Sequence, residues 1–217
     1  SGLSSLPHAF PAVSGATAVD IGITLAMIAN SEKKKIVVFK GNYAGKTLLS
    51  LIGTEDIAWR RHFPPLYNDV VYIDPFAPHA GEALNTVLSS GEVALVWFEV
   101  IQGGTSNVLP DELIQIINKM KDKHGYFIGV DEILMSCFRA GKQFSHEGKV
   151  TSPDIITMAK TLSDGTFPMA MTLVSDNVYL KAISKNPGAV HFYERLYKNQ
   201  LGAHIALHGI NKVLSPD

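Results

Sequence analysis

Short apolar runs alternate with helical patterns along most of this chain. The strand-like runs occupy residues 36–39, 70–73, 93–98, 127–130, 155–158 and 169–174. The helical patterns lie at residues 21–28, 81–88, 111–121, 177–183 and 201–213. Strands that are apolar on both faces and alternate with helices favour a parallel sheet that is covered on both sides. The sequence therefore predicts an α/β fold with a mostly parallel central sheet flanked by helices.

The composition agrees with one compact unit over residues 1–217. Hydrophobic residues make up 46% of the chain and charged residues 18%, which is enough apolar material for a well-buried core. The net charge is −1, and the basic run from Lys33 to Lys35 leads directly into the first strand. A solvated loop explains this run better than a binding patch, so we expect no nucleic-acid partner.

Cysteine, hydropathy and histidine content narrow the possible environments and cofactors. The single cysteine, Cys137, excludes an intrachain disulfide framework and favours a cytoplasmic location. No apolar run approaches the length of about 18 residues that a membrane span needs, so no membrane association is expected. His204 and His208 share one face of the last predicted helix, but no acidic residue lies between them. We therefore expect no metal site.

Polar and charged residues follow several of the predicted strands. In parallel sheets, ligands bind outside the carboxyl ends of the strands. Tyr43 comes shortly after the first strand, Glu99 follows residues 93–98, Asp131 follows residues 127–130, and Lys160 follows residues 155–158. These side chains are therefore the first candidates for a functional site.

Lys160 and Asp131 have the chemistry that pyridoxal phosphate requires. A lysine after a long apolar run is poorly solvated if the run is buried, which favours its neutral, nucleophilic form and suits a Schiff base. A carboxylate that faces a pyridine nitrogen keeps that nitrogen protonated, and Asp131 has this potential. Asp131 as an ordinary helix cap remains an alternative.

The loop that precedes the first predicted helix is a candidate phosphate site. A helix start offers free N–H groups and a favourable dipole, and this loop adds two hydroxyl groups. Ordinary helix capping by the same residues remains an alternative. The candidates are Ser14, Gly15, Ala16 and Thr17.

Four residues, of which Ile133 and Gln102 are new, are candidates for contacts with a planar cofactor ring or with its surroundings. Tyr43 lies in a glycine-containing loop and offers an aromatic face, and Ile133 offers a branched aliphatic face. A loop anchor for Tyr43 and a core position for Ile133 are equally possible. Glu99 and Gln102 follow the most hydrophobic strand, where a carboxylate needs a partner or a function. A hydrogen bond to a loop amide would satisfy Glu99 equally well.

A kinase-like phosphate loop is a remote alternative. Residues 41–47, G-N-Y-A-G-K-T, follow a strand and imitate the G-x-x-x-x-G-K-T motif. Only three residues separate the two glycines here, whereas the motif requires four. The shorter loop would not form the same nest of amides around a phosphate, so a nucleotide-binding function is not favoured.

Five segments along residues 14–160 resemble known sequence motifs. Residues 14–20, S-G-A-T-A-V-D, resemble S-G-S/T-E-A-N-E, and residues 39–47 are similar to F-x-G-x-Y-H-G-R-T. Residues 99–103, E-V-I-Q-G, resemble E-P-V/I-Q-G, and residues 131–142 resemble D-E-V-Q-T-G-F-G-R-T-G-K. Residues 153–160, P-D-I-I-T-M-A-K, closely match P-D-I-V-T-L-A-K. In this order, the five segments resemble the class III aminotransferases, a family of fold-type I pyridoxal phosphate enzymes.

This resemblance implies an aminotransferase that moves an amino group between small-molecule amine and carbonyl substrates. It implies that Lys160 forms the Schiff base with pyridoxal 5'-phosphate and then transfers a proton, while Asp131 contacts the pyridinium nitrogen. It places Tyr43 and Ile133 on the two ring faces, with the phosphate at Gly15 and Ala16. It further implies a homodimer, and it makes residues 1–217 the large cofactor-binding domain, with the family's N-terminal segment and small C-terminal domain outside the chain.

Several positions depart from the family pattern. Leu134 stands where many members have a glutamine near the phenolic oxygen of the cofactor. The family's phosphate-contacting threonine is missing from residues 191–201, where Arg195 or Tyr197 is a possible substitute.

Other reactions remain open from the sequence. A racemase, an aminomutase or a decarboxylase would use the same lysine and aspartate, because the reaction depends on which substrate bond lies perpendicular to the ring. A non-catalytic protein or a module of a multidomain synthase is a further alternative.

Overall fold

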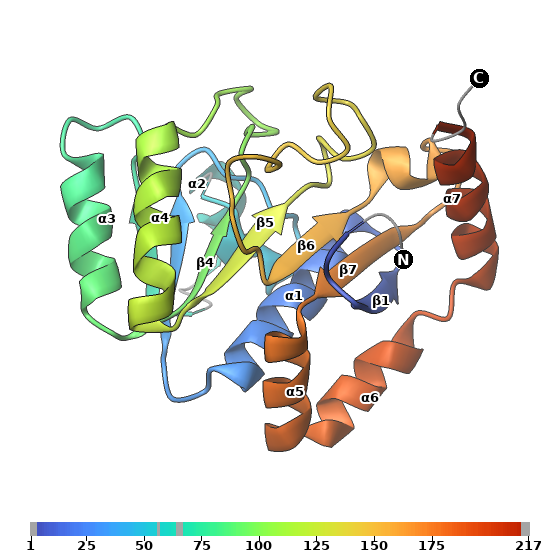
Figure 1. Cartoon of the computed structure of the whole chain (residues 1–217), viewed down its shortest axis with the longest axis horizontal. Coiled ribbons are helices and arrows are strands. Elements are labelled where there is room, and N and C mark those ends of the chain that lie inside the picture. The colour runs from blue at the N-terminus through green and yellow to red at the C-terminus, as the bar shows by residue number, and fades with distance from the viewer. Residues whose placement is uncertain (1–3, 56, 64–66, 214–217) are drawn as a thin grey trace.

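A single mixed sheet forms the centre of the protein (Figure 1). The computed structural model describes residues 4–55, 57–63 and 67–213. The sheet has seven strands in the order β1-β7-β6-β5-β4-β2-β3. β7 runs antiparallel to both of its neighbours, and the strands from β6 to β3 are parallel. The strands are β1 (His8–Ala12), β2 (Lys35–Phe39), β3 (Val70–Ile73), β4 (Val93–Phe98), β5 (Phe127–Asp131), β6 (Ile155–Met158) and β7 (Ala170–Val174).

Helices cover both faces of this sheet. One face packs against α1 (Gly15–Ala29), α5 (Asp176–Lys185) and α6 (Pro187–Leu196). The other face packs against α3 (Ala80–Ser89) and α4 (Asp111–His124), which lie side by side in Figure 1. The last helix, α7 (Gln200–Val213), packs against the antiparallel part of the sheet. Short turns of helix complete the fold: η1 (Ser50–Gly53), α2 (Ile57–Arg60) and η2 (Lys160–Ser163). The predicted fold class is confirmed.

Local sequence signals explain where the main helices begin and end. Ser14 caps α1, because its hydroxyl accepts a hydrogen bond from the Thr17 amide and the Thr17 hydroxyl accepts one from the Ser14 amide. α4 has acidic residues in its first turn and basic residues in its last, as the helix dipole favours, and it ends at Gly125 with a left-handed backbone. These signals fix the helices that flank the parallel strands.

β1 and α6 were not predicted from the sequence, and neither were the short turns η1, α2 and η2. β1 is a short strand that contains Pro11 and pairs antiparallel with β7, and proline is tolerated only at such an edge. α6 begins after Asn186, whose side chain accepts a hydrogen bond from the Ala189 amide, with Pro187 as its first residue. Residues 191–196, which belong to the segment that lacks the family's threonine, lie in this helix.

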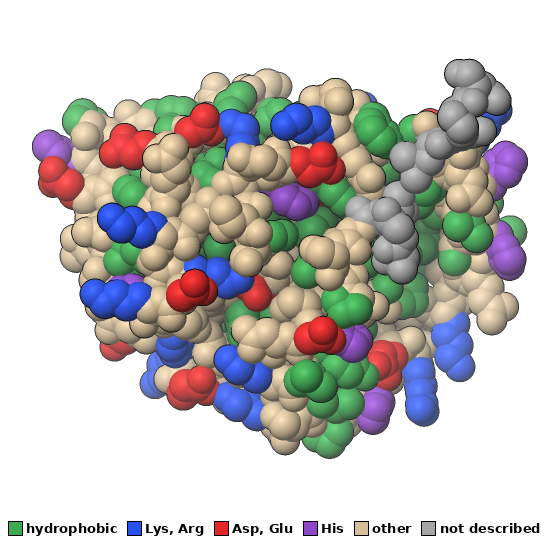
Figure 2. All heavy atoms as spheres, in the orientation of Figure 1, with side chains coloured by type: hydrophobic (Ala, Val, Ile, Leu, Met, Phe, Trp, Pro, Cys, Tyr) green, Lys and Arg blue, Asp and Glu red, His purple; other side chains and the backbone are tan. Residues whose placement is uncertain are grey.

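Charged side chains of both signs are interspersed on the face shown in Figure 2. None of the helices in the described part of the chain has the length and hydropathy needed to cross a membrane.

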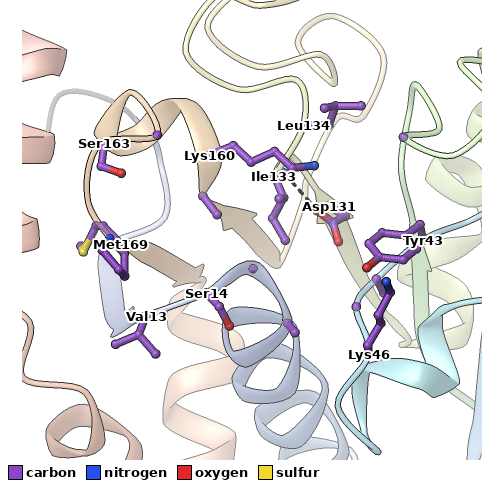
Figure 3. Close-up of a pocket in the computed structure, with 18 of the residues that line it drawn as sticks. Val13, Ser14, Tyr43, Lys46, Asp131, Ile133, Leu134, Lys160, Ser163 and Met169 are labelled. Atoms are coloured by element: carbon purple, nitrogen blue, oxygen red, sulfur yellow. Dashed lines mark hydrogen bonds between the residues drawn. The ribbon is translucent and has the colours of Figure 1, made fainter.

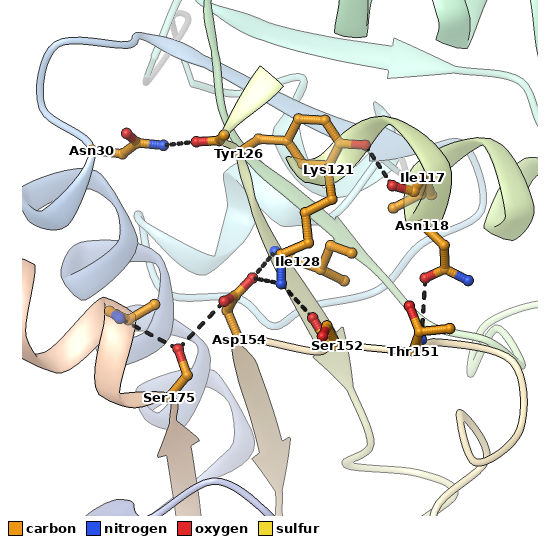
Figure 4. Close-up of polar contacts among 12 residues, drawn as sticks. Asn30, Ile117, Asn118, Lys121, Tyr126, Ile128, Thr151, Ser152, Asp154 and Ser175 are labelled. Carbon is orange, nitrogen blue, oxygen red and sulfur yellow. Dashed lines mark hydrogen bonds and ion pairs between the residues drawn. The ribbon is translucent and has the colours of Figure 1, made fainter. Parts of the chain in front are cut away.

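The buried carboxylate of Asp154 connects β5, β6 and β7 at the ends of the strands opposite to Lys160 (Figure 4). Asp154 is 3% exposed, and its Oδ2 accepts hydrogen bonds from the Ile128 amide at 2.8 Å and the Lys121 ammonium at 2.7 Å. Its Oδ1 accepts a bond from the Ser175 hydroxyl at 3.3 Å. Burial raises the pKa of Asp154, and the ion pair with Lys121 opposes that change.

Replacing Asp154 with alanine is expected to lower the free energy of unfolding by about 3–5 kcal/mol, because it removes the ion-pair partner of the Lys121 ammonium and leaves the Ile128 amide without its acceptor. Urea denaturation measures this loss. The matched control is Lys149→Ala, which removes an exposed ion pair with Asp111 and should have a much smaller effect. Equal losses in the two variants would contradict the role of Asp154.

Candidate functional site

The order of the strands brings the predicted site residues to one edge of the sheet. β6, β5, β4 and β2 are consecutive neighbours and run parallel, so their carboxyl ends meet. A cavity of about 650 Å³ opens at this edge. Figure 3 shows Lys160, Asp131 and Tyr43 around it, with Ser14 at the start of α1. The predicted residues on its wall are Ser14, Gly15, Ala16, Tyr43, Glu99, Asp131, Ile133 and Lys160.

Asp131 ends β5 inside this cavity and is 5% exposed. Its Oδ1 accepts a hydrogen bond from the Ile133 amide at 3.0 Å, whereas its Oδ2 has no hydrogen-bond partner among the described residues. Burial raises the pKa of Asp131 well above its ordinary value, and the nearby Glu99 carboxyl raises it further. A buried carboxyl oxygen without a partner is costly, so this atom is suited to an external cationic donor.

Glu99 lies on the same wall and connects two loops. Its two oxygens accept hydrogen bonds from the Tyr43 amide and the Gly103 amide, each at 2.9 Å. The hydrogen bond to a loop amide that the sequence left open is therefore present, and Glu99 still lines the cavity. Burial raises the pKa of Glu99 to about 7, while the two amides and the positive charge of Lys160 oppose the change.

The raised pKa of Glu99 predicts how the stability of the cofactor-free protein depends on pH. The folded protein binds a proton at Glu99 more tightly than the unfolded chain does, so its stability falls as the pH rises from about 4.5 to about 7. The expected contribution is roughly 3 kcal/mol over this window. Denaturation at pH 5 and at pH 7.5 measures it, and Glu99→Gln should flatten the curve. A Glu99→Gln variant with the wild-type pH dependence would contradict this assignment.

One residue, Ala159, separates Lys160 from the end of β6. The Lys160 side chain extends over the cavity toward Asp131 and Leu134 (Figure 3). Its backbone is left-handed, with φ of 47°, which is strained for any residue except glycine. The side chain is exposed rather than desolvated, so the expectation of a buried amine is wrong for this structure. The chain turns into η2 at this residue, where Lys160 lines the cavity.

The start of α1 forms another part of the wall. The hydroxyls of Ser14 and Thr17 bond each other's backbone as a helix cap, and Thr17 does not line the cavity. Gly15 and Ala16 begin the helix, so their N–H groups have no acceptor within it. Gly15 also allows a close approach, because a Cβ at this position would lie 2.8 Å from Ile133. The backbone of Gly15 and Ala16, rather than the hydroxyls, is thus available to an anion.

The remaining predicted residues have different environments. Tyr43 and Ile133 reach the cavity from separate loops, Tyr43 after β2 and Ile133 after β5. Gln102 does not line the cavity, since its amide donates to the Lys40 carbonyl at 2.7 Å and accepts from the Thr105 hydroxyl at 2.8 Å. It instead holds the loops after β2 and β4 together.

Other wall residues were not identified from the sequence. Lys46 lines the cavity and stacks its ammonium over the Trp59 ring, 3.5 Å from the ring centre. The loop from Gly165 to Met169 supplies an apolar side through Phe167 and Pro168. Lys46 occupies the position of the arginine in the family's G-R-T segment. This match could have identified Lys46 as a site residue from the sequence. Arg195 and Tyr197, considered as substitutes for the missing threonine, lie at the end of α6 and do not line the cavity.

Comparison with known proteins identifies the family. The family model described as aminotransferase class-III matches residues 3–191. The chain belongs to the class III aminotransferase family. Among curated relatives of this family, ornithine aminotransferase 1 of Staphylococcus saprophyticus is 29% identical over 81% of the chain and 46% of the relative. Acetylornithine aminotransferase of Xanthomonas campestris is 33% identical over 68% of the chain and 36% of the relative. This class III chain thus spans less than half the length of these curated relatives.

Solved structures share the fold of this class III chain. Ornithine aminotransferase from Toxoplasma gondii superposes with a TM-score of 0.81 at 20% identity, over 96% of this chain and 49% of that one. An amine transaminase from an uncultivated Pseudomonas species, solved in its PLP-bound form, has a TM-score of 0.85 at 18% identity, over 96% and 53% of the two chains. At these identities the comparison establishes the fold.

The cavity of this class III chain fits pyridoxal phosphate at three points. The unpartnered Oδ2 of Asp131 suits a protonated ring nitrogen. The N–H groups of Gly15 and Ala16 suit a phosphate, and the Lys160 amine suits an aldehyde. Among the described residues, no cluster of three histidine, cysteine, aspartate or glutamate side chains is arranged to hold a metal ion.

Proposed function

We propose that this chain is the cofactor-binding domain of a pyridoxal phosphate-dependent aminotransferase, with Lys160 as the Schiff-base lysine. One observation carries the proposal: the Lys160 amine and the unpartnered Asp131 oxygen face one cavity that also includes the start of α1. When bound, pyridoxal phosphate supplies an aldehyde that condenses with amines and a ring that withdraws electrons.

The residues of the cavity have separate roles in this proposal. Lys160 would hold the cofactor through its aldehyde and would be the group that moves a proton during amino transfer. Asp131 holds the proton on the ring nitrogen. Gly15 and Ala16 bind the phosphate through their N–H groups, and Tyr43 and Ile133 orient the ring from its two faces. The proposed domain covers residues 1–217.

Amino transfer can be tested with the substrates named for the relatives. Purified protein is loaded with pyridoxal phosphate and mixed with ornithine or acetylornithine, and the aminated form of the cofactor is measured by chromatography. We expect it to accumulate with at least one amine donor. Racemisation or decarboxylation of the donor without accumulation of aminated cofactor would instead identify another pyridoxal phosphate reaction. Failure to bind the cofactor at all would favour a non-catalytic module.

A homodimer is part of the proposal and rests on the family resemblance together with an exposed apolar groove. The groove has a volume of about 620 Å³ and lies between α1 and η1, with Met27, Ile28 and Leu48 on its wall. An apolar surface of this kind is typical of a protein interface. The single cysteine supports a cytoplasmic location as a further proposal.

Replacing Leu48 with glutamate is expected to convert the dimer to monomers, because it places a charge in the apolar groove. Light scattering after size-exclusion chromatography measures the mass. The matched control is Leu180→Glu on α5, since Leu180 and Leu48 are each 59% exposed and Leu180 lies outside the groove. Dissociation by both variants, or by neither, would contradict an interface at this groove.

A further inference from the structure

A row of polar side chains crosses the sheet beneath α1. Asp131 on β5 is in register with Thr157 on β6, and Thr157 is in register with Thr172 on β7. Residues in register on neighbouring strands project from the same face of a sheet. Thr157 and Thr172 are both fully buried, and Asp131 is 5% exposed. Three polar side chains therefore lie side by side in an otherwise apolar core.

The hydroxyl groups of this row have different partners. Thr172 donates its proton to the Ala18 carbonyl of α1 at 2.7 Å, so this proton is not free for Thr157. The Thr157 hydroxyl and the Asp131 Oδ2 both lack a hydrogen-bond partner within the residues that the structure describes. A buried hydroxyl is stabilised by donating to an acceptor, and the strand register places the Asp131 carboxyl group next to the Thr157 hydroxyl.

We propose that Thr157 is a positioning residue, which holds the Asp131 carboxylate ionised and aimed at the ring nitrogen of the cofactor. This inference rests on the proposed function, because it concerns the same site. Burial is the main cause that raises the pKa of Asp131, and the Thr157 hydroxyl and the Ile133 amide act against it. Without the hydroxyl, Asp131 would more readily take up a proton and could no longer keep the ring nitrogen protonated.

The test compares two ligands and three variants. The ligands are pyridoxal phosphate and its analogue with carbon in place of the ring nitrogen, and both can react with Lys160 through their aldehyde. The variants are Thr157→Val, which is nearly isosteric and lacks the hydroxyl, Thr157→Ser, which restores it, and the control Thr172→Val in the same row. Calorimetry gives each dissociation constant, and circular dichroism confirms that each variant is folded.

We expect Thr157→Val to weaken binding of pyridoxal phosphate about tenfold and to leave binding of the analogue unchanged or tighter. Thr157→Ser should restore the wild-type ratio between the two ligands, and Thr172→Val should not change that ratio. Equal weakening of both ligands by Thr157→Val would show a merely structural role and overturn the proposal, as would no weakening of either. A wild-type protein that binds neither ligand would overturn the proposed function itself, and with it the role of Thr157.

Discussion

Replacing Lys160 with alanine is expected to lower the rate of amino transfer by at least about 10⁴-fold, because it removes both the covalent attachment and the proton carrier. The fold should remain, since the side chain is exposed. Initial rates with an amine donor and a carbonyl acceptor measure the first effect, and thermal unfolding measures the second.

A second substitution at this position separates catalysis from backbone strain. Lys160→Gly should be as inactive as Lys160→Ala, yet more stable by roughly 1 kcal/mol, because glycine adopts the left-handed backbone without steric conflict. Substantial transfer by either variant would contradict the assigned role of the amine.

Replacing Asp131 with alanine is expected to weaken cofactor retention by roughly 10- to 100-fold, since a hydrogen bond to a charged group is lost from a buried site. Proton transfer should slow by orders of magnitude as well, because an unprotonated ring is a poorer electron sink. Dialysis against buffer without cofactor, followed by measurement of bound cofactor, tests retention, and single-turnover kinetics tests the proton transfer.

The same position should show a trade-off between stability and function. Asp131 is buried with an unpartnered oxygen and a raised pKa, so the cofactor-free protein is expected to become more stable in the Asp131→Asn variant at pH 7.5. Asp154→Ala is the contrasting control, because loss of the Asp154 carboxylate should lower the free energy of unfolding while the contacts to the cofactor stay in place. Near-native retention and rate in Asp131→Ala would refute its role.

The fold was predictable because its determinants are local and periodic. Buried strands such as residues 93–98 are uniformly apolar, and the parallel order follows from their alternation with helices. β1 and α6 were missed for different reasons. The short β1 depends on its pairing with β7, which local sequence does not encode, whereas the start signal of α6 at Asn186 was present and was overlooked.

The site was predictable to the extent that it depends on strand ends. Asp131, Glu99 and Lys160 come together because their strands are parallel neighbours. The solvent exposure of the Lys160 side chain was not predictable in the same way. Lys160 follows an apolar strand yet is exposed, because the backbone turns at that residue.

Side-chain partners also escaped prediction, since they depend on tertiary contacts. The Gln102 side-chain amide donates to the Lys40 carbonyl, which belongs to a loop that Gln102 meets only in the folded protein. The Ser14 and Thr17 hydroxyls cap their own helix, so the capping alternative that the sequence left open is the one observed.

Reduction with borohydride tests the central claim most directly. The protein is mixed with pyridoxal phosphate, reduced, digested and analysed by mass spectrometry, which locates the lysine that carries the cofactor. We predict stoichiometric labelling of Lys160 in the wild type and its loss in Asp131→Ala at limiting cofactor. Labelling that falls instead on Lys46 or another surface lysine, or that is substoichiometric and scattered, would contradict the claim that this cavity binds the cofactor between Lys160 and Asp131.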